Sequence, residues 1–336
     1  MKKETIKTED SVGQLLAHDI TRIVQGDSKG PLFRKGHRIE PEDVDKLLDV
    51  GKNNIYILTL EDGDVHEDDA GRRLGAAISG PGTYCKEPKE SRVNIFAEYD
   101  GLLRINTEAV YKINNLENSL CATIPVNTVV KKDQMLAGTK VVPLVVAESD
   151  VADVEEICMK EGPVISVLPF VPKKVACVIT GSEVYNHRVN DAFAPVIRSK
   201  IDAYGSELFD IAYAPDDSEM ITSAILKARD NGAELIVVTG GMSVDPDDLT
   251  PGAILATGAR LVKQGSPVLP GAMFLVAYLD EIPVLGVPAA GMYFKDTMFD
   301  RMLPFVFAGI EIRRSDIVAM GVGGLIMNNE RYIVEQ

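Results

Sequence analysis

Two turns in the C-terminal half of the chain carry residues that could bind an anion. Residues 180–183 (TGSE) and residues 239–243 (TGGMS) each follow a run of β-branched residues. Such runs are typical of buried parallel strands, whose carboxyl ends open onto a ligand crevice. Gly240 and Gly241 expose consecutive backbone amides with no side chain to block a phosphate group. The two turns therefore predict a ligand site at one edge of a sheet.

Carboxylates follow the expected strands in the same half of the chain. These acidic residues are Asp216, Asp217, Asp245, Asp247 and Asp248. Their oxygens are the hard ligands that Mg²⁺ prefers. Amides for an anion beside carboxylates for a metal predict a phosphorylated or nucleotide-like ligand. The structural alternative is that the Gly-Gly pair only turns the chain and that Asp245, Asp247 and Asp248 cap the helix that opens at Thr250.

Composition restricts the classes of partner. A chain of 336 residues can form two or three domains, and 46% hydrophobic with 25% charged residues is ordinary for a soluble globular protein. The formal net charge of -15 disfavours a nucleic-acid partner, because the phosphate backbone would be repelled. An anionic ligand then needs a metal or local cations, for which Lys263, Lys295 and Arg301 are candidates.

Cysteine spacing and hydropathy bear on location. Cys85, Cys121, Cys158 and Cys177 form no Cys-x-x-Cys pair, which disfavours zinc and a disulfide framework. The first ten residues contain no apolar run of the kind that a secretory signal has. The longest apolar runs fall well short of the roughly twenty residues that span a bilayer. These features predict a cytoplasmic protein with no membrane partner.

From residue 171 to residue 310 the pattern alternates between strand and helix. The expected strands are 175–180, 208–213 and 235–238, the expected helices are 193–204, 218–230 (capped by Ser218) and 293–307, and a hairpin is expected at 273–287. Short connections between alternating strands and helices predict a doubly wound α/β domain with a mostly parallel sheet.

Residues 1–170 have a different character, which predicts a smaller α+β or β-rich region of two subdomains. Helices are expected at 41–50 and 68–79, a strand at 54–60, and small antiparallel β structure over 92–146. The two prolines and two lysines of 167–174 indicate a linker. Residues 311–336 form a C-terminal extension.

The motifs of the α/β region resemble the molybdopterin-binding domain shared by MoeA, MogA, gephyrin and the amino-terminal part of CinA. That family has TG(D/S)E after one strand, an aspartate after the next, and TGG with a Ser- or Thr-containing loop and a further Asp after a third. The matching segments here are 180–183 (TGSE), 215–217 (PDD) and 239–248 (TGGMSVDPDD). The resemblance covers roughly residues 172–310 and implies a MogA-like fold.

The resemblance implies that the ligand is molybdopterin, a reduced pterin with a dithiolene and a terminal phosphate. The residues implied to bind it are Thr180, Gly181, Ser182, Glu183, Thr239, Gly240, Gly241, Ser243 and Pro288. The glycine amides would meet the phosphate, the hydroxyls would add hydrogen bonds, and Glu183 would accept from pterin nitrogens. Mg²⁺ is implied at Asp216, Asp217, Asp247 and Asp248, with Asp217, Asp247 and Asp248 as the catalytic residues.

The N-terminal half adds a likeness to MoeA at residues 31–58, so the chain is most similar to a shortened MoeA. This implies Mg²⁺-dependent insertion of molybdate into adenylylated molybdopterin, with molybdopterin or its adenylylated form and molybdate as partners. It also implies a homodimer.

Three departures from the MoeA pattern keep other functions open. Asp245 stands where MoeA-like proteins usually have Gly, residues 287–291 (VPAAG) replace a Leu-Pro-Gly-Asn-Pro turn, and only about two dozen residues follow Gly309 where MoeA has a β domain. The first alternative is a non-catalytic molybdopterin-binding regulator or carrier. The second is a MogA-like adenylyltransferase or a CinA-like nucleotide pyrophosphatase, and residues 247–251 (DDLTP) favour these types.

Overall fold

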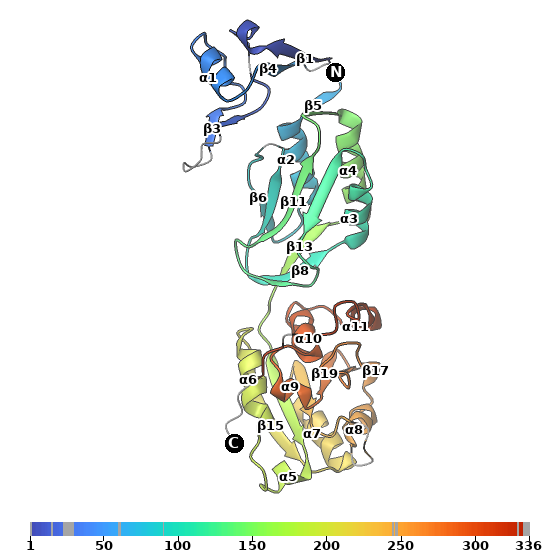
Figure 1. Ribbon diagram of the computed structural model, residues 1–336. Coiled ribbons are helices and arrows are strands. Elements are labelled where there is room, and N and C mark those ends of the chain that lie inside the picture. The colour runs from blue at the N-terminus through green and yellow to red at the C-terminus, as the bar shows by residue number, and fades with distance from the viewer. Residues whose placement is uncertain are drawn as a thin grey trace. The chain divides into compact units, whose positions relative to one another are not determined.

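The computed structural model describes residues 2–14, 16–22, 30–59, 62–89, 91–243, 245, 248–327 and 329–331 (Figure 1). It divides into two compact units, Met1–Leu168 and Pro169–Gln336. Within the described ranges, every helix is too short or too polar to cross a membrane.

The first part of unit 1 is a small α+β structure. Strands β1 (Lys2–Lys7) and β4 (Asn54–Thr59) pair antiparallel, as do β2 (Ile20–Arg22) and β3 (Gly30–Phe33). Helix α1 (Asp43–Asp49) buries Leu47 and is followed by Gly51, whose φ of 77° suits glycine. The helix expected at 41–50 and the strand expected at 54–60 are therefore confirmed, although Leu60 lies outside the described residues.

The second part of unit 1 is a layer of helices on antiparallel sheets. The four-stranded sheet has the order β6 (Thr83–Cys85), β7 (Val93–Ala97), β11 (Met135–Val141), β9 (Ser119–Thr123), with antiparallel pairs throughout. Two smaller sheets consist of β10 (Val129–Val130), β8 (Gly101–Ile105) and β13 (Ile165–Pro169), and of β12 (Val145–Ala147) and β5 (Asp64–His66). The antiparallel β structure expected over 92–146 is confirmed.

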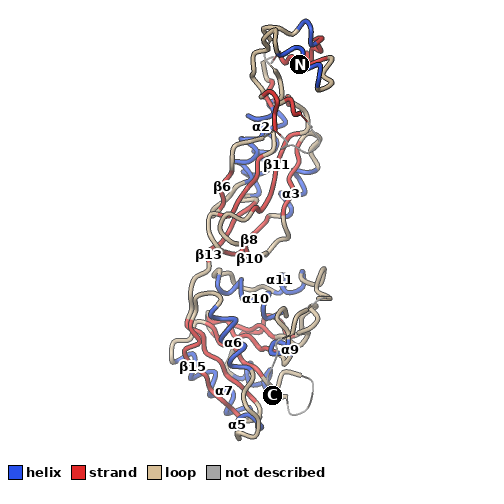
Figure 2. Tube along the Cα trace, turned by 60° about the vertical axis from the view of Figure 1, so that its left-hand side comes forward, coloured by secondary structure: helices blue, strands red, loops and turns tan. Residues whose placement is uncertain are grey.

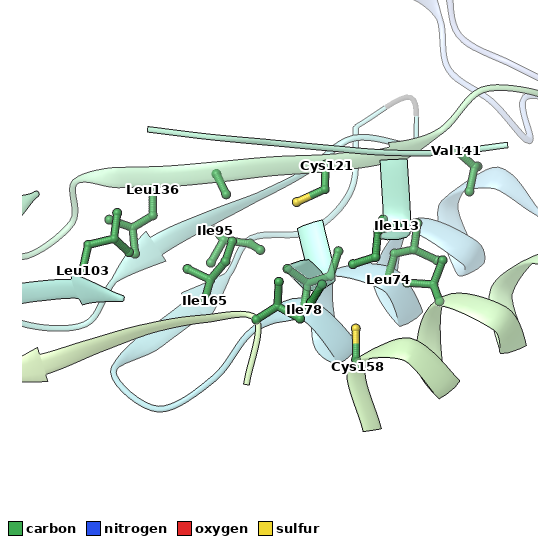
Figure 3. Close-up of a cluster of buried hydrophobic side chains, with 14 of the residues drawn as sticks. Leu74, Ile78, Ile95, Leu103, Ile113, Cys121, Leu136, Val141, Cys158 and Ile165 are labelled. Carbon is green, nitrogen blue, oxygen red and sulfur yellow. The ribbon is translucent and has the colours of Figure 1, made fainter. Parts of the chain in front are cut away.

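Helices α2 (Glu67–Ile78), α3 (Thr107–Asn114) and α4 (Glu148–Glu161) build the core of this part. Leu74 and Ile78 of α2 pack with Ile95 of β7 and Ile113 of α3 (Figure 3). Helix α2 confirms the helix expected at 68–79. Helix α3 interrupts the stretch expected to be β structure, because Asn106 caps it by accepting from the amide of Ala109 at 3.1 Å.

Unit 2 is an α/β domain around a six-stranded sheet. The strand order is β15 (Glu207–Ala214), β14 (Lys174–Thr180), β16 (Leu235–Thr239), β19 (Ile282–Val287), β18 (Leu275–Leu279), β17 (Arg260–Gln264). The first four strands are parallel to one another, whereas β18 and β17 are antiparallel to their neighbours. The mostly parallel sheet confirms the predicted fold class.

Helices cover both faces of this sheet, and Figure 2 traces them in blue beside the red strands. The helices are α5 (Ser182–Tyr185), α6 (Phe193–Asp202), α7 (Ser218–Asp230), α8 (Thr250–Ala256), α9 (Ala290–Tyr293), α10 (Met298–Phe307) and α11 (Arg314–Ala319). Val178 and Val238 face α7 and α8, while the intervening residues of both strands are buried on the opposite face. Complete burial explains why these strands are continuously apolar.

Several expectations for unit 2 need correction. The helix expected at 293–307 is divided, because Phe294 is extended and Thr297 begins α10 with a capping box to Asp300. Asp217, not Ser218, caps α7. The edge strand β17 and helix α11 were not expected, and β13 occupies part of the stretch expected to be a linker.

Candidate functional site

The candidate site is the sheet edge where the four parallel strands of unit 2 end. The register pairs Thr180 with Ala214, Ile179 with Thr239, and Thr239 with Val287. The carboxyl ends of β14, β15, β16 and β19 are therefore level with one another. The turns that follow them carry all three motif segments and the Pro288 turn along one edge, as the strand pattern predicts.

The Gly-Gly turn after β16 lies directly against the end of β14. Gly240 has a φ of 94°, and a Cβ atom there would lie 2.1 Å from the carbonyl oxygen of Thr180. Gly241 has a φ of 54°, and its Cβ would lie 2.8 Å from Oγ1 of Thr250. Backbone conformation and close approach both require glycine at these two positions. The two glycines thus allow the TGG turn to pack directly against the TGSE turn.

A hydroxyl network holds this contact together. Oγ1 of Thr250 donates to the carbonyl of Gly240 at 2.7 Å and lies 3.1 Å from Oγ1 of Thr180. Because the Thr250 proton points to Gly240, the Thr180 hydroxyl is the donor between the two threonines. Thr180 and Thr250 are both buried, so each bond forms away from water. Thr180 therefore lies at the predicted edge with its hydroxyl engaged within the protein, and Thr250, expected only as the start of a helix, is part of the same network.

Ser182 and Asp216 connect the ends of β14 and β15. The amide of Ser182 donates to Oδ2 of Asp216 at 2.9 Å, and the amide of Asp216 donates to Oγ of Ser182 at 3.2 Å. The amide of Gly181 donates to the carbonyl of Ala214 at 3.1 Å. The Gly181 amide, expected to face a phosphate, is therefore engaged within the protein.

Asp217 and Asp248 also serve local structure. Oδ1 of Asp217 accepts from the amide of Met220 at 2.8 Å and caps α7. Oδ2 of Asp248 accepts from the amide of Asp245 at 3.1 Å, so it shapes the loop before α8 and does not cap that helix. Asp247 lies outside the described residues.

The donor set suits a Mg²⁺ ion that is shared with a ligand. In the described part of the chain, no group of three or more His, Cys, Asp or Glu side chains is close enough to enclose a metal ion. Asp216, Asp217 and Asp248 each commit one carboxylate oxygen to a backbone amide, which leaves the other for an ion. Mg²⁺ is usually bound through one or two carboxylates plus water and phosphate oxygens.

The remaining predicted ligand residues differ in accessibility. Glu183 and Ser243 are exposed, and Pro288 is half-buried at the end of β19. Thr239 is fully buried, and within the described residues its Oγ1 has no hydrogen-bond partner. A buried hydroxyl without a partner is costly. Of these residues, Thr239 would therefore gain the most from a hydrogen bond to a ligand.

The cations proposed from sequence are mostly neutralised by neighbours. Nζ of Lys295 lies 2.6 Å from the carboxylate of Glu330, and Arg301 pairs with Asp296 at 3.3 Å. Lys263 donates to the carbonyl of Gln264 at 3.4 Å.

Arg188 is a cation that sequence reasoning did not select. It is exposed five residues after Glu183, and its amide donates to the carbonyl of Glu183 at 2.8 Å. Within the described structure it forms no ion pair, and the signal for it was its closeness in sequence to the TGSE turn.

A buried ion pair anchors the segment that follows the Pro288 turn. Lys200 of α6 pairs with Asp300 of α10, and its Nζ also donates to the carbonyls of Phe294 and Lys295 at 3.4 and 3.5 Å. Desolvation lowers the pKa of Lys200 and raises that of Asp300. The same Asp300 accepts from the amide and hydroxyl of Thr297 at 2.9 and 2.8 Å. This network fixes the break between α9 and α10.

Two family models match the chain. Residues 176–308 match a model described as "Probable molybdopterin binding domain", and residues 5–59 match a domain of unknown function (DUF8806).

Curated relatives match over shorter stretches. A CinA-like protein of Mycobacterium avium (strain 104) is 35% identical over 80 residues, which is 24% of this chain and 18% of that protein. A molybdopterin molybdenumtransferase of Synechococcus elongatus is 27% identical over 131 residues, which is 37% of this chain and 31% of that protein. The chain thus spans less than a third of either relative.

Solved structures resemble part of the chain. The protein CinA of Thermoplasma acidophilum is 16% identical with a TM-score of 0.36, over 40% of this chain and 98% of that chain. The tungsten cofactor synthesizing protein MoaB of Pyrococcus furiosus is 17% identical with a TM-score of 0.28, over 36% of this chain and 88% of that chain. The three ordered motifs all lie within residues 176–308, the segment that matches the model described as "Probable molybdopterin binding domain".

Proposed function

We propose that unit 2 binds molybdopterin at the carboxyl edge of its sheet and that the chain serves Mg²⁺-dependent insertion of molybdate into adenylylated molybdopterin. The observation that carries this proposal is the direct packing of the Gly240 turn on the end of β14, which brings the TGG and TGSE segments into one site. The family match of residues 176–308 and the molybdenumtransferase relative support the substrate class.

Different residues of the site would contact different parts of the ligand. The turn at Gly240 and Gly241 would face the phosphate, and the buried hydroxyl of Thr239 would gain the partner that it lacks among the described residues. The exposed carboxylate of Glu183 would accept from the donor nitrogens of a pterin. Arg188 would offset the negative charge that the ligand brings to an acidic edge.

For this reaction the protein would position the ligand and neutralise the charge of its phosphate group. Asp217 and Asp248 would hold Mg²⁺ through the oxygens that are not bonded to backbone amides, and the ion would neutralise phosphate oxygens when bound. The Ser182–Asp216 bonds keep the ends of β14 and β15 in fixed relation, so the ligand meets a preformed surface. No side chain is required as a covalent nucleophile.

The test is molybdate-dependent release of AMP from adenylylated molybdopterin, measured together with equilibrium binding of the same compound. The wild type is expected to bind the compound and to release AMP only with molybdate and Mg²⁺. The Asp217→Asn variant should still bind the compound but should release AMP far more slowly. Asp230→Asn is the matched control, since Asp230 lies at the other end of α7 and pairs with Arg229. Failure of the wild type to bind the compound would refute the proposal.

Two observations favour other uses of the same site. The carboxylates of Asp216 and Asp217 are already bonded to backbone amides, which would suit a non-catalytic regulator or carrier; binding without AMP release would identify that case. The higher identity to a CinA-like protein favours a nucleotide pyrophosphatase, and hydrolysis of ADP-ribose would identify it. A MogA-like adenylyltransferase would instead consume ATP with molybdopterin.

We also propose that the protein is cytoplasmic and that it forms a homodimer. Sedimentation of the full chain at increasing concentration tests the assembly, and a monomer at all concentrations would exclude it.

A further inference from the structure

The four-stranded sheet of unit 1 has one face that its own helices do not cover. Helices α2, α3 and α4 pack on the inner face, where Ile95, Cys121 and Leu136 join the core. A groove of about 380 Å³ lies along β9 and β11. We call it the outer groove; its lining includes Arg92, Leu120, Ala122, Met135, Gly138 and Lys140.

The outer groove is apolar where a solvated sheet face is normally polar. Leu120 is 47% exposed and Met135 is 44% exposed, and Ala122 is also exposed. An antiparallel sheet with one face in water usually presents polar side chains outward. Contiguous exposed apolar side chains mark interaction sites.

The outer groove also gathers positive charge in an acidic protein. Arg92 and Lys140 are its only ionisable lining residues, and in the described structure neither forms an ion pair. Nε of Arg92 donates to Oδ1 of Asn94 at 2.8 Å, and a Cβ at Gly138 would lie 3.7 Å from that Nε. The Arg92 side chain therefore lies along the sheet over Gly138.

A third cation stands beside the groove. Nζ of Lys86 lies 4.3 Å from the ring centroid of Phe96, and Phe96 is the register partner of Met135. The carboxylate of Asp133 accepts from the hydroxyl of Tyr84 at 2.8 Å and forms no ion pair with these cations among the described residues. Uncompensated cations in a chain of net charge -15 favour an acidic partner.

We propose that the outer groove binds an extended peptide segment of another protein that carries both carboxylates and apolar side chains. The carboxylates would meet Arg92 and Lys140, and the apolar side chains would cover Leu120 and Met135.

Shape and charge favour a peptide over other occupants. The groove follows strands of five and seven residues, about 17 to 24 Å at roughly 3.4 Å per residue, which suits an extended segment. A second copy placed face to face on this groove would bring two cationic surfaces together, with no carboxylate in either lining to compensate them.

The test is selection of a phage-displayed random 12-residue peptide library on the full chain. Enriched peptides are expected to combine at least two Asp or Glu with apolar residues. Their Kd should rise at least tenfold for Arg92→Glu/Lys140→Glu and for Leu120→Glu. Lys131→Glu/Lys132→Glu is the matched control, because it makes the same charge change at exposed residues outside the groove lining. Far-UV circular dichroism verifies that each variant is folded.

Four results would overturn the proposal. They are the absence of enriched peptides, enrichment of neutral or basic peptides, equal binding to the Arg92→Glu/Lys140→Glu variant, and a dimer of the wild type that Leu120→Glu abolishes. The last result would assign the face to a second copy. None of them depends on molybdopterin, so the outcome is separate from that of the proposed function.

Discussion

The hydroxyl oxygens of Thr180 and Thr250 lie 3.1 Å apart, 70 residues distant in sequence, and this contact joins the end of β14 to the start of α8. The Thr250 hydroxyl also donates to the carbonyl of Gly240, so one side chain connects three segments of the candidate site. The motif threonine at 180 is therefore held by the protein itself, and its first role is to shape the site.

Replacing Thr250 by valine tests this network. Valine has the same shape but leaves the Gly240 carbonyl and the Thr180 hydroxyl buried without partners, which should cost about 1–3 kcal/mol of stability. Hydrogen exchange by mass spectrometry should then show faster exchange in β14 and β16. Thr250→Ser keeps the hydroxyl and should restore most of the protection; equal protection in the wild type and the valine variant would contradict the network.

Gly240→Ala should destabilise unit 2 strongly. The added Cβ would lie 2.1 Å from the Thr180 carbonyl oxygen, and the φ of 94° is strained for alanine. We expect a loss of about 3 kcal/mol or more, from overpacking together with backbone strain. Gly252→Ala is the control, because that helical position has open space around its Cβ and should gain up to about 1 kcal/mol. Urea unfolding monitored by circular dichroism compares the two variants.

Substitutions of Asp217 separate its capping role from its proposed metal role. Asn is as good an N-cap as Asp, so Asp217→Asn should leave α7 intact, whereas Asp217→Ala should cost about 1 kcal/mol. Loss of Mg²⁺-dependent activity in both variants, with loss of stability only in the alanine variant, is the expected result. If Asp217→Asn is fully active, the carboxylate acts only as a cap.

Asp43 should make the N-terminal part of unit 1 sensitive to acid. Burial alone would raise the pKa of its carboxyl, but hydrogen bonds from His37, Lys46 and the Glu40 amide lower that pKa from 3.8 to about 2. The folded pKa is depressed, so the stabilisation is present above about pH 4 and is lost as the pH falls towards 2. The shift corresponds to about 2 kcal/mol.

An NMR titration of side-chain carboxyl carbons measures the Asp43 pKa directly, with Asp43→Asn used for assignment. In the wild type, the protection of the α1 amides against hydrogen exchange should weaken as the pH falls from 4 to 2. The same change of protection in Asp43→Asn would show that other groups cause it.

Thiol reactivity should distinguish Cys85 from the other cysteines. Cys85 is exposed, whereas Cys121, Cys158 and Cys177 are buried as free thiols. Burial raises the pKa of Cys121 and of Cys158 to about 11, and raises that of Cys177 further, so the reactive thiolate is scarce. A disulfide exchange reagent at pH 8 should modify one thiol in the native protein and four after unfolding; Cys85→Ser should abolish the native reaction.

Local patterns in the sequence were sufficient to predict most strands of unit 2, and they also predict where its candidate site lies. The continuous apolar runs before Thr180 and Thr239 predict buried parallel strands because both faces of those strands are covered by helices. Parallel strands in one sheet end at the same edge, so the order of the motifs along the chain already predicts that their turns meet.

Tertiary contacts decided the roles of the residues at that edge. Gly240 must be glycine because of Thr180, 60 residues earlier, and the Gly181 amide is engaged by Ala214 on a neighbouring strand. The division between α9 and α10 depends on Lys200, which reaches Asp300 from α6. The cations Arg92 and Lys140 come to lie on the same face of the sheet only because β7 and β11 pair.

The sequence by itself determined the fold class of unit 2 and most of its strands and helices, and it predicted the edge at which a ligand should bind. Only the tertiary structure decided which carboxylates cap or connect loops, which amides are engaged, and which face of unit 1 is left open. The physical reason is that periodicity and turn chemistry act between near neighbours in the chain, whereas hydrogen-bond partners, burial and charge compensation are set by residues that meet only after folding.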